Sequence, residues 1–566
     1  MSAIYTPPPD ARQSASLLLL RDGQAGLEVL LLRRAERARD WLSGATVFPG
    51  GVLEAGDRAA ARFVVGSSDE ALSARYGLAG GILDHALAAV RESFEEIGLL
   101  LACDASGRAA TPGPAWADWR QRLQRREATL ADACQALGLH LDLSRFFAWS
   151  HWLTPPGTAT RFDTRFFVAA APPGQAAQAD QGEATELMWL PPTQALDPQR
   201  GYKLFPVTRR TLRELAAFVD VDAALFAAAR LPAPIPRVMP RHARTRQGPT
   251  IVVPDHLAFA EVCKLDPEGL AHDVMTELVA GQPVRLSPRV LRVTAPNPGV
   301  MTGPGTNSYF VGDPPEDRWA LIDPGPADPV HLAALQAAAP GPVRWVLATH
   351  THRDHSPGAA AAAAAFGAVV LGRRPQHAKG QDPDFAPTRE PMDGECLMLG
   401  SASTLRAIHT PGHASNHLCW LLEQEGLLFT GDHVMQGSTV VIDPPDGDMG
   451  AYLRSLQALL DEELQWLAPG HGFLVAEPHA VLRALIAHRL AREAKVAAAL
   501  RARGQASLDE MLPEVYADTP QHLHPVARRS LLAHLLKLRE DGRAEDLAQG
   551  RWRWIEAAAL RPADAT

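Results

Sequence analysis

A loop with the composition of a metal site runs Thr349-His350-Thr351-His352-Arg353-Asp354-His355. The apolar residues 345–348 before it predict a buried strand, and the alanine-rich residues 359–365 after it predict a helix. Three imidazoles and a carboxylate therefore share one tight connection, a donor set that suits zinc or a similar first-row metal. Because His350, His352 and Asp354 alternate, one extended stretch can present them together, which leaves His355 free to face a second ion.

Three further potential ligands follow other apolar runs that predict strands. They are His413 after Pro411-Gly412, Asp432 after Thr430-Gly431, and His471 after Pro469-Gly470. A glycine beside a ligand lets the backbone turn closely around an ion. The nearby His409, His417 and His433 lie outside this pattern, and we expect them to support the ligands or to face solvent.

These elements, in the order THTHRDH, HTPGH, TGDH and PGHG, resemble the metallo-β-lactamase superfamily. The upstream stretch Leu321-Ile322-Asp323-Pro324-Gly325 is similar to that family too. The resemblance implies an αββα sandwich over residues 284–480 with two zinc ions, and implies that Asp323 braces the metal loop. The glycine-rich stretch that ends in Thr306 and Asn307 is expected to border the site. The implied ligands are His350, His352 and His413 for one ion, Asp354, His355 and His471 for the other, and Asp432 as a bridge.

Hydrolysis is the reaction that such a site implies. Two metal ions a few ångström apart lower the pKa of a shared water and stabilise charge on the oxygen under attack. Asp354 is expected to orient the nucleophile or to shuttle its proton. The ligand set alone leaves a phosphodiester, a thioester and an amide open as the bond that is cleaved.

The residues after the sandwich, 481–550, show three helical patterns and a short β-wing. They resemble the winged helix of β-lactamase-like proteins related to animal mitochondrial endoribonucleases, through HRxxRE at 488–493 and Thr519-Pro520, Leu523-His524, Ala527, Leu531, His534-Leu535, Leu538 and Gly542. Residues 481–566 carry 14 Lys and Arg against 11 Asp and Glu, whereas the whole chain has a net charge of −9. This local excess is compatible with phosphate contacts.

The resemblance to this branch makes single-stranded RNA the expected substrate. A thioester or another small metabolite is the first alternative. A nucleic-acid-binding or nucleotide-binding protein with vestigial catalysis is the second. Many winged helices serve in packing or dimerisation, so a homodimer stays open.

A second group of acidic residues lies in the first third of the chain, on a helix predicted over 83–101. Glu92, Glu95 and Glu96 stand at positions i, i+3 and i+4, so they share one helix face. Three carboxylates on one turn repel each other unless a cation lies between them. Ligands that are all oxygen favour Mg²⁺ or Mn²⁺.

The stretch RExxEExG at 91–98 resembles the second half of the Nudix box, and residues 50–57 resemble its first half. The resemblance implies an α/β/α sandwich over residues 11–230 that cleaves a diphosphate, in a branch with members acting on coenzyme A and its esters. Asp57 stands where the family usually has glutamate, and 33 residues separate it from Arg91. The implied site comprises Glu92, Glu95 and Glu96 as metal ligands, Arg91 as the residue that orients a glutamate, Gly50 and Gly51 beside them, and Glu183 as a general base.

The composition agrees with this multidomain α/β architecture. The chain has 566 residues, of which 46% are hydrophobic and 21% charged, as in globular proteins of roughly three or four domains. The negative net charge argues against a general nucleic-acid coat. No apolar run suits a membrane span and no secretory pattern opens the chain, so we expect a cytoplasmic protein. The Pro- and Arg-rich residues 231–283 are predicted to be a linker or an appendage between two hydrolase domains.

Overall fold

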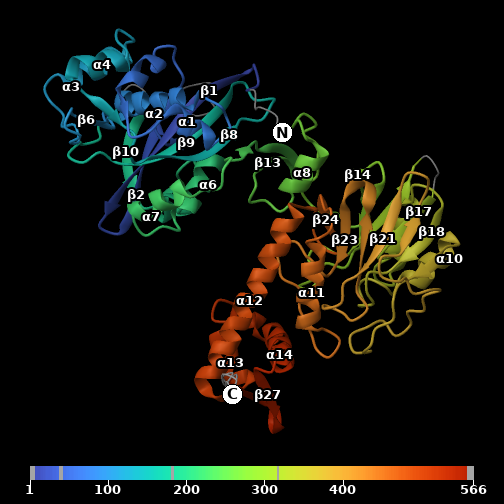
Figure 1. Ribbon diagram of the computed structural model, residues 1–566. Helices are drawn as coiled ribbons and strands as arrows, with labels where there is room; N and C mark the ends of the chain where they lie inside the picture. The colour runs from blue at the N-terminus through green and yellow to red at the C-terminus, as the bar shows by residue number, and fades with distance from the viewer. Residues whose placement is uncertain (1–6, 37–42, 180–183, 315–317, 557–566) are drawn as a thin grey trace, which may run out of the picture. The chain divides into compact units, whose positions relative to one another are not determined.

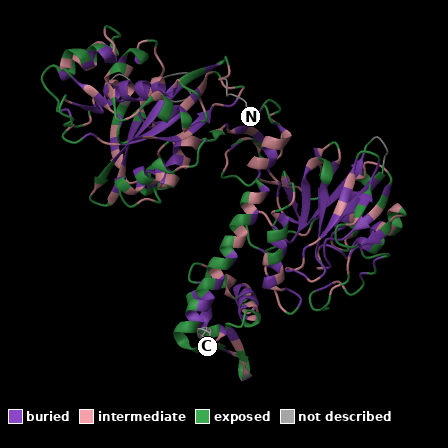
Figure 2. Ribbon diagram, in the orientation of Figure 1, coloured by how far each residue is buried: buried purple, intermediate pink, exposed green. Residues whose placement is uncertain are grey.

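The computed structural model describes residues 7–36, 43–179, 184–314 and 318–556. The chain forms two compact units that divide between His242 and Ala243. Figure 1 shows the helices and strands of each unit, and Figure 2 shows that buried residues concentrate in the strands and on one face of the helices beside them. Among the described helices, none combines the length and the apolar composition that a membrane crossing needs.

The first unit is built on one mixed sheet in the order β10-β2-β1-β9-β8-β11, with β3 beside β2 and β4 beside β1. The central strand β1 pairs antiparallel with β2 and parallel with β9. A small sheet of β5, β7 and β6 lies apart from it. The strands are β1 Ala11–Gly23, β2 Gly26–Arg34, β3 Thr46–Val47, β4 Gly50–Val52, β5 Val64–Val65, β6 Ala102–Cys103, β7 His140–Asp142, β8 Phe146–Leu153, β9 Arg161–Ala170, β10 Ala184–Leu190 and β11 Arg237–Val238.

Helices cover both faces of this sheet, as the predicted α/β/α sandwich requires. The apolar side of α2 packs Leu87, Val90 and Phe94 against Leu17 and Leu19 of β1. Helix α7 covers the opposite face, over β8 and β9 (Figure 1). The helices are α1 Asp69–Ala74, α2 Ile82–Ile97, α3 Trp116–Gln124, α4 Leu130–Leu137, α5 Pro192–Ala195, α6 Pro206–Leu215 and α7 Val221–Ala229, with 3-10 turns η1 Asp57–Phe63 and η2 Pro198–Arg200.

The second unit contains two six-stranded sheets that face each other. Their inner faces share one apolar core, in which Tyr309 of one sheet lies 5.0 Å from Phe429 of the other, measured between ring centroids. The first sheet is β14 Pro283–Ser287, β15 Val290–Thr294, β16 Asn307–Asp313, β17 Arg318–Ile322, β18 Val343–Leu347 and β19 Val369–Leu371. The second is β20 Cys396–Met398, β21 Thr404–His409, β22 Leu418–Leu422, β23 Leu427–Gly431, β24 Trp466–Pro469 and β25 Val475–Ala476.

Helices cover the outer faces of these sheets and complete the predicted αββα sandwich. Helices α9 Pro329–Ala338 and α10 Ala359–Phe366 pack on the first sheet, and α11 Met449–Leu459 packs on the second. Strands β17 and β18 are parallel, and so are β23 and β24. The carboxyl ends of each parallel pair lie at the same edge of their sheet, where the chain continues into the loops with the predicted ligands.

A long helix, α12 Pro478–Arg503, leads from the sandwich into the C-terminal domain (Figure 1). Its last turns pack with α13 Leu508–Val515 and α14 His524–Glu540 around Leu500, Met511 and Leu535. Three strands, β26 Gln505–Ser507, β28 Arg551–Trp554 and β27 Ala544–Leu547, form the wing. The structure therefore has the predicted winged-helix arrangement.

The region predicted as a linker, 231–283, is folded. Strand β11 joins the sheet of the first unit, whereas hairpin β12 Arg241–Thr245 and β13 Gly248–Val252 and helix α8 Phe259–Leu265 precede the sandwich of the second. Glu261 of α8 accepts hydrogen bonds from both Nη atoms of Arg292, at 2.7 and 2.8 Å, and both side chains are buried. This ion pair and a few apolar contacts tie α8 to the sandwich, a tertiary arrangement that the Pro- and Arg-rich composition does not reveal.

Candidate metal centre and carboxylate helix

Asp323 holds the start and the end of the predicted metal loop. It follows β17 in a left-handed conformation, with φ of 49°. Its Oδ1 accepts a hydrogen bond from the Thr349 amide at 2.7 Å, and its Oδ2 accepts one from His355 Nδ1 at 2.8 Å. The bond at Nδ1 fixes the tautomer of His355, so that Nε2 faces the centre of the site.

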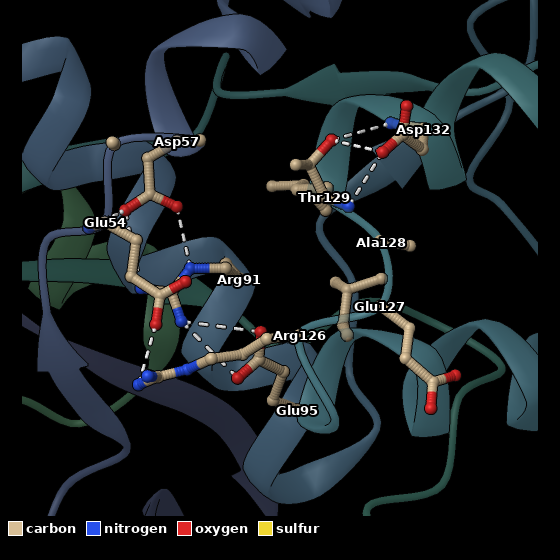
Figure 3. A pocket seen from close by; sticks show the side chains of 13 residues that line it. Glu54, Asp57, Arg91, Glu95, Arg126, Glu127, Ala128, Thr129 and Asp132 are labelled. Atoms are coloured by element: carbon tan, nitrogen blue, oxygen red, sulfur yellow. Dashed lines mark hydrogen bonds and ion pairs between the residues drawn. The ribbon is translucent and has the colours of Figure 1, made fainter.

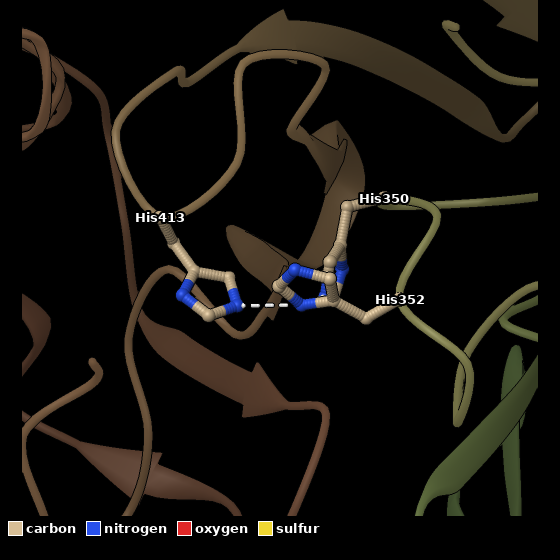
Figure 4. Close-up of side chains that lie close together, drawn as sticks. All are labelled: His350, His352 and His413. Carbon is tan, nitrogen blue, oxygen red and sulfur yellow. Dashed lines mark hydrogen bonds between the residues drawn. The ribbon is translucent and has the colours of Figure 1, made fainter. Parts of the chain in front are cut away.

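Three imidazoles form a first group of donors: His350, His352 and His413 (Figure 4). His352 Nδ1 lies 3.0 Å from His350 Nε2 and 3.0 Å from His413 Nε2. His413 Nδ1 donates to the Val441 carbonyl at 2.7 Å, so its Nε2 is left without a proton. Burial, with His413 nearby, lowers the pKa of His352 to about 3, and burial also lowers the pKa of His350. Neutral imidazoles that converge in this way are what a metal ion requires.

The second group combines two imidazoles and two carboxylates: His355, His471, Asp354 and Asp432. His471 Nε2 lies 3.3 Å from an oxygen of each carboxylate. Yet His355 Nε2, His471 Nε2 and Asp432 Oδ1 are buried without a hydrogen-bond partner in the described part of the chain. Buried polar atoms normally have a partner, and a cation between these four side chains would supply one.

Electrostatics and geometry both link the two groups. Burial disfavours the charged imidazole of His471, but the carboxylates of Asp432 and Asp354 outweigh it and raise its pKa to about 9. The second oxygen of Asp432 lies 3.8 Å from His413 Nε2 of the first group, so its carboxylate faces both groups. The seven predicted ligands thus lie together as two neighbouring sets, and their chemistry fits two first-row metal ions.

The residues predicted to border the site hold its loops. Asn307 Nδ2 donates to the carbonyls of Pro469 and Gly472, at 3.1 and 2.8 Å, and Thr306 pairs with His471 through the backbone. Gly470 fits because a Cβ there would lie 2.7 Å from His355 Cε1. Thr306 and Asn307 are buried, so their role in the structure is to position the His471 loop.

The neighbouring histidines occupy three different places. His417 is fully buried, and its ring stacks on that of His350 with centroids 5.1 Å apart. His433 is also buried, and its ring centroid lies 5.5 Å from that of His417. His409 is half-buried, and its Nε2 lies 3.2 Å from the Ser415 carbonyl oxygen. None of the three belongs to the two donor groups.

In the first unit, Arg91 of α2 organises the predicted Nudix carboxylates. Its Nε donates to Asp57 at 2.7 Å, and its Nη1 donates to Glu92 at 2.9 Å. Asp57 is buried in η1, so an aspartate in place of glutamate still reaches the guanidinium. Burial and Glu92 raise the pKa of Glu95 to about 7, against the opposing effect of Arg91.

The glycine pair of the box allows the helix to approach β4 closely. Glu96 accepts a hydrogen bond from the Gly50 amide at 3.0 Å. A Cβ on Gly51 would lie 2.1 Å from Glu92 Oε1, so any larger residue there would displace this carboxylate. The structure thus brings Gly50 and Gly51 beside the predicted ligands. The predicted base Glu183 lies outside the described residues.

Three family models match the chain in succession. They are the NUDT19 Nudix domain at residues 80–205, the metallo-beta-lactamase superfamily at 301–471, and the beta-lactamase associated winged helix domain at 507–552. An atrochrysone carboxyl ACP thioesterase of Aspergillus chevalieri is 34% identical over 286 residues, which cover 48% of this chain and 88% of that protein. The chain belongs to the metallo-β-lactamase superfamily. It is a metal-dependent hydrolase in which a Nudix domain precedes the metallo-β-lactamase domain and a winged helix follows it.

Two further proteins are similar to parts of this chain. The beta-lactamase-like protein 2 homolog of Drosophila melanogaster is 31% identical over 271 residues, covering 46% of this chain and 90% of that protein. A crystal structure of a NUDIX hydrolase from Alicyclobacillus acidocaldarius is 28% identical and covers 38% of this chain and 96% of that chain, with a TM-score of 0.33.

The metallo-β-lactamase domain also contains a buried polar network that no motif revealed. Asp446 accepts hydrogen bonds from Ser415 Oγ at 2.5 Å and from Gln381 Nε2 at 2.8 Å. Gln381 in turn accepts one from Thr351 Oγ1 at 2.6 Å, within the metal loop. The network therefore connects the loops of His352 and His413. Its residues are ordinary polar residues far apart in sequence, so only their arrangement in space identifies them.

A pocket of about 370 Å³ opens beside the carboxylates of the Nudix domain (Figure 3). One wall is formed by residues of the box and of α2, namely Glu54, Ala55, Gly56, Asp57, Arg91 and Glu95. The opposite wall is formed by the end of α3, the connection to α4 and the start of α4, namely Leu123, Arg126, Glu127, Ala128, Thr129, Leu130 and Asp132. The sequence motifs of the Nudix box include no residue of the second wall.

Proposed function

We propose that the metallo-β-lactamase domain hydrolyses a thioester and that the Nudix domain cleaves a diphosphate of the coenzyme A type. The observation that carries the first part is the convergence of seven donors in two sets around Asp432, in a chain whose relative of 34% identity is named a thioesterase. A coenzyme A thioester contains both bonds, which gives the fusion of the two domains a chemical reason.

The proposed ligands follow the two groups described above. His350, His352 and His413 would hold one ion and Asp354, His355 and His471 the other, with Asp432 between them. Nitrogen-rich sites of this kind favour zinc, which supplies an activated water at neutral pH and neutralises charge on the reacting oxygen. Asp354 is the most exposed carboxylate of the set, at 26%, so it can orient the attacking water and relay its proton.

RNA phosphodiesters are the second candidate, favoured by the winged helix that follows the sandwich. Several cations of that domain face an acid in exposed ion pairs, which contribute little to stability and which a phosphate can replace. Examples are Arg528 with Asp509, Arg551 with Glu510, and Arg553 with Glu545.

The proposed activity of the Nudix domain rests on Glu92, Glu95 and Glu96. Their oxygens would hold Mg²⁺ or Mn²⁺, which supplies charge neutralisation for the diphosphate. Arg91 holds Glu92 and Glu95 in place through its guanidinium, while Asp57 fixes the other side of that guanidinium. The protein would then be bifunctional, with one metal site for each bond.

The experiment that tests this proposal uses the full chain with two substrates and two variants. Zinc-loaded protein is incubated with an acyl-coenzyme A and, separately, with labelled single-stranded RNA, beside Asp354→Ala and Glu96→Gln. Thiol release that is lost in Asp354→Ala and kept in Glu96→Gln supports the thioester assignment. RNA cleavage without thiol release overturns it in favour of the second candidate. Adenosine-nucleotide release from coenzyme A with Mg²⁺ should be lost only in Glu96→Gln, and its absence in the wild type overturns the Nudix assignment.

A further inference from the structure

The pocket beside the Nudix carboxylates has an arginine on its second wall. Arg126 lies in the connection between α3 and α4, and in Figure 3 its side chain extends beside Glu95 toward Glu54. The other guanidinium that lines this pocket, Arg91, is buried and engaged by Asp57, Glu92 and the Val52 carbonyl. Arg126 is therefore the cation of this pocket that can reach a ligand.

The backbone at Arg126 adopts a conformation that favours glycine. Its φ is 58°, in the left-handed region, which costs a non-glycine residue about 1–2 kcal/mol. Helices α2 and α4 end with glycine in this conformation, Gly98 at 73° and Gly138 at 65°, whereas the turn after α3 has an arginine. Backbone hydrogen bonds from the Arg126 amide to Leu123 and from the Glu127 amide to Arg122 hold the turn. A left-handed residue that closes a helix in this way is usually glycine, so a glycine at position 126 should keep the turn.

The guanidinium of Arg126 is held only weakly. Its side chain is 77% exposed and pairs with Glu54 at 3.1 Å, and no other ion pair of this side chain occurs among the described residues. Exposed pairs of this kind contribute little, so a stronger anion can replace Glu54. The pocket is otherwise acidic, with Glu54, Asp57, Glu95, Glu127 and Asp132 on its walls, so an anion would reach it together with divalent cations.

We propose that Arg126, whose backbone belongs to the second wall, exchanges Glu54 for a phosphate of the diphosphate substrate. This inference rests on the diphosphate hydrolysis proposed for the Nudix domain. The carboxylates would hold the cations that bridge the phosphate oxygens, and the guanidinium would bind the remaining oxygens in a planar, bidentate manner. Arg126 then acts as a substrate-binding residue that aligns the diphosphate above the carboxylates of α2.

The test compares kcat and KM for coenzyme A in the full chain with Mg²⁺. Arg126→Ala should raise KM about tenfold, equal to about 1.4 kcal/mol, with kcat changed less than about threefold. Arg126→Lys should raise KM less than Arg126→Ala does, because lysine keeps the positive charge but cannot form the bidentate contact of arginine. Arg125→Ala, which removes the neighbouring exposed arginine outside the pocket, should leave both constants unchanged. Equal constants for Arg126→Ala and Arg125→Ala would overturn the inference.

Arg126→Gly separates binding from folding. Glycine relieves the left-handed backbone, so the melting temperature should be no lower than that of the wild type, while KM should rise as it does in Arg126→Ala. A lower melting temperature together with an unchanged KM would give Arg126 a purely structural role and would refute substrate binding.

A binding measurement keeps this inference distinguishable from the proposed activity. If the wild type fails to cleave coenzyme A, the activity is refuted, and the binding of an α,β-methylene nucleoside diphosphate with Mg²⁺ is measured by calorimetry. A Kd about tenfold weaker in Arg126→Gly than in Arg125→Ala would sustain the phosphate contact, whereas equal Kd values would refute it.

Discussion

The carboxylate of Asp323 accepts a hydrogen bond from His355 Nδ1 at 2.8 Å and holds the Thr349 amide with its other oxygen. This relationship links two successive strands of the sandwich, because Asp323 follows β17 and the metal loop follows β18. One acidic residue therefore fixes the tautomer of a proposed ligand and the position of the loop that carries it.

Asp323→Asn should weaken zinc binding roughly 10- to 100-fold, because residues behind metal ligands typically contribute that much. An amide group in this place can turn a donor toward His355 Nδ1 and disturb its tautomer. The affinity is measured by competition with a chromophoric chelator. Asp384→Asn, in an exposed loop of the same domain, is the matched control. Equal affinity of the two variants would show that Asp323 has no influence on the metal.

Asp446→Asn should also weaken zinc binding, through the connection between the loops of His352 and His413. The amide cannot accept from both Ser415 and Gln381 in the way that a carboxylate does, so these loops gain freedom. We expect about a tenfold loss of zinc affinity, close to the lower end for residues behind metal ligands. Asp443→Asn in the same loop removes a partly exposed pair with Arg529 and should leave the affinity unchanged. A zinc affinity of Asp446→Asn equal to that of the wild type would contradict this account.

The clustering of the seven proposed ligands could be predicted from the sequence, because few side chain types suit such a metal site and because His350 and Asp432 follow recognisable apolar strands. Continuous apolar residues predict buried strands such as β18, whereas the layers of both sandwiches follow from the resemblance of the motifs to two families. The network of Asp446 and Gln381 could not be predicted, because hydrogen bonds between distant loops leave no local pattern in the sequence. The left-handed backbone conformation of Arg126 could not be predicted either, since an arginine in such a turn has no sequence signature.

Helix α8, near the boundary between the two units, is another feature that the sequence does not predict. The Pro- and Arg-rich composition around it predicts a linker or an appendage, and in the structure the ion pair between Glu261 and Arg292, with apolar contacts, ties α8 to the sandwich. Both side chains are almost fully buried, at 2% and 1% exposed. The contact joins residues 31 positions apart, so no local pattern in the sequence indicates it.

Glu261→Gln should therefore destabilise the second unit by about 3 kcal/mol, because it leaves the guanidinium of Arg292 buried without a counter-charge. The free energy of unfolding is measured with urea, following a signal of the second unit. The double variant Glu261→Leu with Arg292→Met removes both charges and should be less destabilised than the single variant. Glu268→Gln, at an exposed position just after α8, is the control. If Glu261→Gln is as stable as Glu268→Gln, the ion pair between Glu261 and Arg292 does not stabilise the packing of α8.

Acid should destabilise the first unit through His85, which is buried beside Arg165. Burial, reinforced by the guanidinium of Arg165, lowers the pKa of His85 from 6.5 to about 4. The unfolded chain therefore takes up a proton between pH 6.5 and pH 4 that the folded unit does not, so stability falls as the pH falls through this window, by about 3 kcal/mol. The melting temperature of the first unit, followed by calorimetry from pH 7 to pH 4, should fall less in His85→Gln, whose amide oxygen can still accept from Arg165. His140→Gln, which replaces a half-buried histidine on β7, should keep the full pH dependence. If the two variants lose stability equally with acid, the protonation of His85 is not the cause.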